Sequence, residues 1–183
     1  MTAIILIIVF VAVAALWVVS VQRKLVAKEE LCKNAMSQIG VQQSSRWDAL
    51  KALAELVKSY NEHEYKTLTD IIAQRSGITS KSSVAEANAQ EELITATLGK
   101  INVIAEQYPE LKASENYAKI MDSVNTYENQ VRMSRMVFND TVTKFNNITR
   151  QFPDSIVAKL LGFASKEYLQ ENEAKAEMPS MKI

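Results

Sequence analysis

Few residues of this chain have the types and spacing that catalysis needs. His63 is the one histidine and Glu64 follows it, but the fourth residue after His63 is Thr67. Zinc proteases with the HExxH pattern place two imidazoles on one helical face, so that site is excluded. Glu91 and Glu92 are carboxylates with no predicted pocket to shift a pKa, and they indicate no acid and base pair. We therefore predict a protein that is not an enzyme and that holds neither a cofactor nor a metal.

A second group of polar residues points to a structural role, because its members fall on or near apolar helical stripes: Gln43, Arg46, Asp48, Glu128, Arg132, Arg135 and Asn139, with Asn146 as a further candidate. Glu128 and Arg132 lie four residues apart and can pair across one helical turn. We predict a buried or half-buried ionic layer in which Arg46 or Arg135 meets Glu128, while Asn139 completes the hydrogen bonds. Such a layer would fix helix register. A ligand site at the layer is the alternative interpretation.

The elements that carry these residues are predicted to be helices. With 4 glycines and 3 prolines in 183 residues, the chain has few of the turns that a sheet protein needs. From Leu25 to Ile72 apolar residues recur every three or four positions, and the stripe passes through Gln43 and Arg46 without changing phase. Gly40 is the weak point of this helix. We predict an all-α fold whose first helix continues directly from the apolar amino-terminal stretch.

That stretch, Thr2 to Val21, has no charged residue and is long enough to cross a bilayer, since about 20 helical residues span the ~30 Å hydrocarbon core. A cleaved signal peptide is the alternative, but the run is too long and no Lys or Arg precedes it. Trp17, Arg23 and Lys24 are predicted to lie at the membrane interface. The basic residues after the span predict an outside amino terminus and a cytoplasmic bulk. The partners expected are the bilayer and further copies of the chain.

Three further helices are predicted after the chain turns within the small, polar stretch at residues 76–90. The second helix starts near Ser83, with Ser80 or Ser82 as alternatives, runs antiparallel to the first and stops at Pro109. The third runs from Ser114 to Gln151. A short fourth helix starts at Asp154 or Ser155 and ends at Gly162, and it is predicted to bury Ile156, Val157, Leu160 and Leu161. The predicted divisions are an anchor at 1–22, a bundle at 23–169 and a disordered tail at 170–183.

The composition argues against nucleic-acid binding and against sites built from several cysteines. Lys and Arg total 21, as do Asp and Glu, so the chain has no general attraction for nucleic acid. The single cysteine, Cys32, excludes an internal disulfide and a cysteine-based zinc site.

Several segments together resemble the LemA family of bacterial membrane-anchored helical proteins: NAMSQIGVQQSSRWDAL at 34–50, LVKSYNEHE at 56–64, EQYPELKASENYAKI at 106–120, YENQVRMSRMVFNDTVTKFN at 127–146 and FPDSIVAKLLGF at 152–163. The family usually reads RRxDLIPNL where this chain has SRWDALKAL, so Arg46 and Asp48 match while one arginine and the proline do not. The resemblance implies a membrane helix, a bundle of long antiparallel helices and no established enzymatic activity. A magnetosome-membrane branch of the family suggests membrane organisation.

These observations favour a non-enzymatic, membrane-anchored scaffold that self-associates through its span and its long helices. An adaptor that holds a different, unidentified protein at the membrane is one alternative. A protein that binds a small ligand or an ion at the polar layer is the other.

Overall fold

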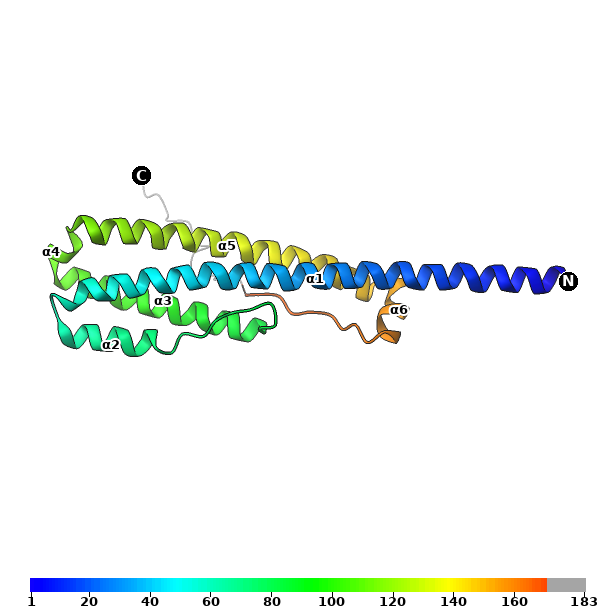
Figure 1. Ribbon diagram of the computed structural model, residues 1–183, viewed down its shortest axis with the longest axis horizontal. Helices are drawn as coiled ribbons and strands as arrows, with labels where there is room; N and C mark the ends of the chain where they lie inside the picture. The colour runs from blue at the N-terminus through cyan, green and yellow to red at the C-terminus, as the bar shows by residue number, and fades with distance from the viewer. Residues whose placement is uncertain (171–183) are drawn as a thin grey trace, which may run out of the picture.

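The computed structural model describes residues 1–170 and confirms the all-α prediction, because these residues contain helices and no strand. The helices form an elongated bundle from which one long helix projects (Figure 1). In chain order they are α1 Thr2–Lys58, α2 Glu62–Ile72, α3 Val84–Gln107, α4 Pro109–Lys112, α5 Glu115–Arg150 and α6 Asp154–Leu160.

α1 is one unbroken helix, so the apolar stretch does continue directly into the bundle as predicted. Within residues 1–170, α1 is the one helix long and apolar enough to cross a membrane, and its apolar window is almost entirely unburied. The helix passes the predicted boundary at 22 and Gly40 without interruption. At ~1.5 Å per residue, α1 is roughly 85 Å long.

The predicted extension of the first helix to Ile72 is wrong. α1 ends at Lys58, where the backbone N–H groups of Tyr60 and Asn61 both bond to the carbonyl oxygen of Val57. Asn61 is extended, and its side-chain oxygen accepts from the N–H groups of His63 and Glu64 to start α2. The apolar spacing continues through this point although the chain turns, so periodicity alone could not reveal the reversal.

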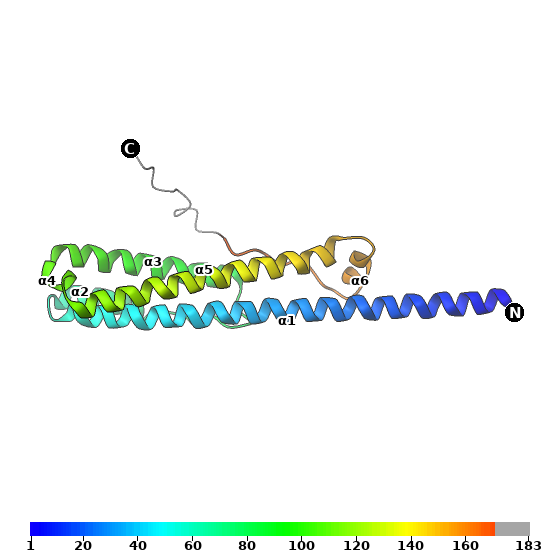
Figure 2. The ribbon, with the colours of Figure 1, turned by 90° about the horizontal axis from the view of Figure 1, so that it is seen from above.

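The direction predicted for the helix after residue 83 is also wrong. Because α2 already reverses the chain, α3 runs parallel to α1, and both views show these two helices running in the same direction (Figure 2). Its start is as predicted: the Ser83 hydroxyl accepts from the Glu86 N–H, and the Glu86 carboxylate accepts from the Ser83 N–H at 2.6 Å. After the short α4, Ser114 caps α5, which runs antiparallel to α1 along most of the bundle.

α6 begins at Asp154 as predicted and ends in a Schellman motif. Gly162 has a φ of 78°, and the N–H groups of Gly162 and Phe163 bond back to the carbonyl oxygens of Lys159 and Ala158. The predicted burial is wrong at three of four positions, because Val157 is buried while the other three are exposed: Ile156, Leu160 and Leu161. Apart from Gln170, the predicted tail lies outside the described residues.

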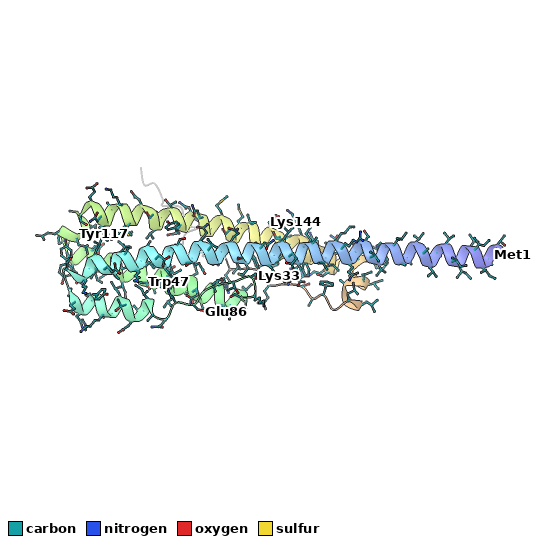
Figure 3. The ribbon with its side chains drawn as sticks, in the orientation of Figure 1. Met1, Lys33, Trp47, Glu86, Tyr117 and Lys144 are labelled. Carbon is teal, nitrogen blue, oxygen red and sulfur yellow. The ribbon has the colours of Figure 1, made fainter. Side chains whose placement is uncertain are left out.

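Two hydrophobic clusters fill the bundle. The span-side core lies nearer the apolar stretch and is built mainly on Val21, Leu25, Met36, Ile39, Ala87, Phe138, Val142, Phe145, Val157 and Leu169. The far core lies at the other end and is built mainly on Trp47, Leu50, Leu53, Leu68, Ile94, Ile101, Ile104, Tyr117 and Val124. Figure 3 shows Trp47 and Tyr117 in the far half of the bundle and Met1 at the opposite end of the molecule.

Candidate functional site

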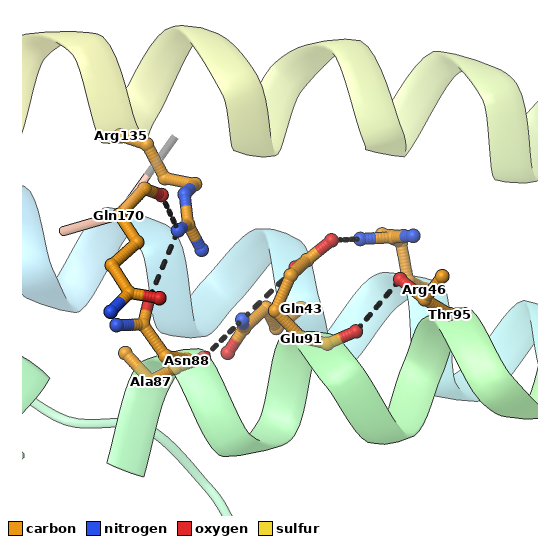
Figure 4. Close-up of polar contacts among 8 residues, drawn as sticks. All are labelled: Gln43, Arg46, Ala87, Asn88, Glu91, Thr95, Arg135 and Gln170. Atoms are coloured by element: carbon orange, nitrogen blue, oxygen red, sulfur yellow. Dashed lines mark hydrogen bonds and ion pairs between the residues drawn. The ribbon is translucent and has the colours of Figure 1, made fainter. Parts of the chain in front are cut away.

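A buried ion pair lies between the two cores. Arg46 on α1 and Glu91 on α3 are 2% and 7% exposed, and the Arg46 Nη1 atom is 2.5 Å from the Glu91 Oε1 atom (Figure 4). α1 presents Arg46 inward because it follows Ile39 by seven residues, two helical turns along the same face. The predicted buried ionic group around Arg46 is therefore present, but the carboxylate facing it is Glu91.

Gln43 extends this pair by one turn of α1. Its amide nitrogen donates to the Glu91 carboxylate and to the carbonyl oxygen of Ala87, each at 3.2 Å. Glu91 thus accepts from two side chains of α1, and both of these side chains are 2% exposed. Hydrogen bonds of this kind lock the register of two helices, since a shift by one turn would leave a charge buried without its partner.

The third helix of the layer is α5, which contributes Arg135. Its Nη2 atom donates to the Asn88 side chain at 3.0 Å and to the carbonyl oxygen of Gln170. Burial lowers the pKa of the Arg135 guanidinium below its ordinary value, the Glu91 carboxylate opposes that change, and the Arg46 cation adds to it. The Glu91 carboxylate therefore interacts electrostatically with two guanidinium groups that come from different helices.

Some buried polar atoms of this region have no hydrogen-bond partner within residues 1–170: Gln43 Oε1, Arg46 Nε, Trp47 Nε1 and Arg135 Nη1. An unpaired buried donor costs about 1–3 kcal/mol, so the layer contributes specificity at some expense of stability.

Three other members of the predicted layer lie elsewhere. Asp48 is exposed and pairs with Arg75 at 3.1 Å, and Arg132 is exposed on α5. Glu128 is half-buried. Asn139 does not complete the hydrogen bonds of the ion pair, because its side chain binds the backbone of Leu169. The layer contains Gln43, Arg46, Glu91 and Arg135, while Asp48, Arg132 and Asn139 lie outside it.

Asn139 and Asn146 instead form an asparagine clamp. Asn139 donates to the carbonyl oxygen of Leu169 at 3.0 Å and accepts from its N–H at 2.9 Å. Asn146, seven residues later on the same face of α5, makes the equivalent pair with Lys166 at 2.9 and 2.8 Å. Together they hold the non-helical segment 163–170 along α5, with Leu169 2% exposed in the span-side core.

Glu91 and the clamp are the features that sequence reasoning missed. Glu91 precedes Ile94 by three residues, so extending the apolar stripe of α3 toward its start would have placed Glu91 inside. The spacing of seven between Asn139 and Asn146 was visible, but their partners are backbone groups of a segment without helical periodicity.

The residues predicted to lie at the membrane interface are on the span side of the bundle. Arg23 and Lys24 are exposed, and Trp17 is half-buried against the span-side core. The layer lines neither of two surface hollows. One of about 430 Å³ lies between α2 and α3 near Lys100 and Val103, and one of about 580 Å³ lies beside α6. Within the described residues, no three His, Cys, Asp or Glu side chains gather as metal ligands would.

The family model described as the LemA family matches residues 35–183. Protein LemA of Metamycoplasma hominis is 26% identical over 156 residues, which cover 83% of this chain and 70% of that protein. Magnetosome protein MamQ of Magnetospirillum gryphiswaldense is 30% identical over 77 residues, which cover 42% of this chain and 28% of that protein. Magnetosome protein MamQ 2 of Paramagnetospirillum magneticum is 29% identical over the same length and also matches over 28% of its own length.

Proposed function

The chain belongs to the LemA family, and on that premise we propose that it is a membrane-anchored scaffold that assembles with copies of itself and catalyses no reaction. The observation that carries the proposal is the continuity of α1, which holds the apolar span at one end and supplies residues to both cores at the other. A bundle joined to its anchor by an unbroken helix has its direction fixed relative to the membrane. That rigidity suits a scaffold.

The surface proposed for self-association is an apolar strip on the solvent side of α5. Met133, Met136 and Val137 are 58%, 59% and 52% exposed, and their spacing of three and four places them on one face. A second copy would cover this strip, and the alanines at 12, 14 and 15 allow close contact between spans. The relatives named magnetosome proteins fit the membrane association proposed here.

The orientation proposed has the amino terminus outside and the bundle in the cytoplasm. Arg23 and Lys24 are exposed immediately after the span, and Lys28 follows one turn later. A protease added to sealed inside-out vesicles should then remove the bundle, and a protease added to intact spheroplasts should not.

The test of the scaffold is the native mass of the full chain after gentle extraction into nanodiscs. We expect a defined homo-oligomer, and we expect Met136→Glu to shift it toward the monomer because the charge would have to be buried. Val103→Glu is the matched control, since Val103 is 55% exposed on α3 and outside the strip. A wild-type monomer would contradict self-association.

The asparagine clamp favours a second candidate function, an adaptor that binds an extended peptide of another protein. α5 already binds the backbone of segment 163–170 through two asparagine side chains. Hydrogen bonds to a backbone do not depend on the side chains of the bound peptide. If another peptide can replace segment 163–170 on α5, a fluorescent peptide of residues 161–170 should bind the Leu169→Asp variant of the full chain. An absence of binding would contradict the adaptor.

A further inference from the structure

α6 and the turn before it expose an apolar ridge. Phe152, Ile156 and Leu160 follow each other at intervals of four and are 81%, 56% and 79% exposed. The opposite side of α6 is buried in the span-side core through Val157 and Ala158. The ridge is thus the outward face of a well-anchored element, and apolar side chains this exposed indicate an interaction surface.

The position of the ridge along α1 indicates what covers it. Trp17 and Val18 pack against the same cluster as Val157 and Ala158. Figures 1 and 2 both place α6 beside α1 at the end of the bundle that faces the span.

The length of the span indicates how deep in the membrane this end of the bundle lies. About 20 helical residues are needed to cross ~30 Å of hydrocarbon, and the uncharged run from Thr2 to Val21 is just long enough. The level of Trp17 and Val18 is therefore the edge of the hydrocarbon. α6 is packed into the same cluster as these residues, so it lies at the level where the hydrocarbon ends.

We propose that α6 is an interfacial membrane segment, which embeds Phe152, Ile156 and Leu160 in the leaflet where the span emerges. This inference rests on the anchoring proposed above and adds a second attachment to it. Arg150 and Lys159 line the hollow of about 580 Å³ beside α6, where their charges would face lipid phosphates. Two attachments on different elements would fix the tilt and rotation of the bundle on the membrane.

Fluorescence depth measurement tests the proposal on the full chain. In a Cys32→Ala background, single cysteines at Leu160 or Ile156 are labelled with NBD, and the protein is reconstituted in nanodiscs with and without brominated lipid. Leu16→Cys in the span is the positive control, and Val103→Cys in the far half is the negative control. We expect a blue-shifted emission at both α6 positions and a loss of intensity in brominated lipid approaching that of the Leu16 probe.

The outcomes separate the two proposals. Quenching of the Leu16 probe with no quenching at Leu160 and Ile156 would overturn the interfacial role of α6 alone. No quenching at Leu16 would overturn the anchor as well. A blue shift at Leu160 that is insensitive to brominated lipid and disappears in nanodiscs shown by their mass to hold one chain would mean that a second copy covers the ridge, and this also overturns the proposal.

Discussion

The span-side core and the far core share α1, α3 and α5 but are completed in different ways. Around the far core, α2 and α4 add regular helical surface, and apolar stripes at intervals of three and four account for the packing. Around the span-side core, the short α6 and the non-helical segment 163–170 close the bundle, and the asparagine clamp holds that segment.

The polar layer lies between the two cores on every helix they share. Gln43 and Arg46 separate them on α1, Glu91 on α3 and Arg135 on α5. Since apolar layers of similar size can slide past one another by a turn, a buried ion pair at the boundary fixes which side chains meet on each side. The packing of the far core is thus specified by helical periodicity, whereas the packing of the span-side core also needs specific polar contacts.

The largest effect is expected from breaking the layer. Glu91→Gln removes the charge opposite Arg46 and leaves that guanidinium buried without compensation, so we expect a loss of about 3 kcal/mol in the free energy of unfolding. Denaturant titration followed by tryptophan fluorescence measures it, because Trp47 is buried next to Arg46. Glu92→Gln, which changes an exposed neighbour on α3, should have almost no effect.

Replacing both partners refines the same test. The double variant Arg46→Met, Glu91→Leu should recover most of the lost stability, because the buried Arg46 charge is removed together with its partner. If each single variant unfolds like the wild type, the layer does not divide the bundle. Glu128→Gln measured in parallel tests the pairing first predicted, and a loss equal to that of Glu91→Gln would add Glu128 to the layer.

A smaller effect is expected where the loop between α2 and α3 crosses α1 at the edge of the span-side core. A Cβ atom at Gly40 would lie 1.9 Å from the carbonyl oxygen of Ile78, so Gly40→Ala must push the loop away. We expect a net loss of about 2 kcal/mol in unfolding free energy after the gain in helix propensity. Gly99→Ala is the matched control, because nothing lies within 4 Å of its Cβ position, and it should stabilise α3 by about 1 kcal/mol. Equal effects at both glycines would contradict the close approach.

Breaking the asparagine clamp should destabilise only the span-side half of the bundle. Asn146→Ala removes both hydrogen bonds to Lys166 and should lower the unfolding free energy by about 1–2 kcal/mol. Hydrogen exchange should show protection lost in segment 163–170 while α2 and α3 keep theirs. Asn147→Ala, an exposed neighbour, serves as control. Simultaneous loss of protection in both halves would mean that they unfold as one unit.

Sequence alone predicted the elements with strong local signals. The stripe of α5 and the caps at Ser83 and Ser114 were found because helical periodicity and capping side chains are local properties. The turn at Asn61 was missed because the apolar spacing passes through it in phase. That single miss also gave α3 the wrong direction.

For the polar layer, sequence found Gln43 and Arg46 but not their carboxylate, because the pairing depends on which helix lies opposite α1. The burial of α6 was mispredicted for a related reason. Ile156 and Leu160 were assigned to a protein core because they are apolar, although their position beside the span gives them another apolar environment.

The smallest effect is expected at the capping box that starts α3. Because the Glu86 carboxylate accepts hydrogen bonds from the Ser83 backbone N–H and hydroxyl, its pKa lies below the ordinary value. A carboxyl whose folded pKa is lowered stabilises the fold above its unfolded pKa, and this stabilisation disappears as the pH falls through the folded value. Ser83→Ala should cost about 1 kcal/mol of unfolding free energy at neutral pH, measured by thermal denaturation.

At low pH the wild type and the Glu86→Gln variant should therefore have nearly equal melting temperatures. The gap in melting temperature should be present at neutral pH and should shrink as the pH falls through the lowered pKa of Glu86, below which both side chains are uncharged. Because Ser83 starts the helix that carries Glu91, fraying at this cap should also reach the polar layer before it reaches the far core. A gap independent of pH would show that the Glu86 charge is irrelevant to the cap, and the boundary between the two cores would then depend on the Arg46 and Glu91 pair alone.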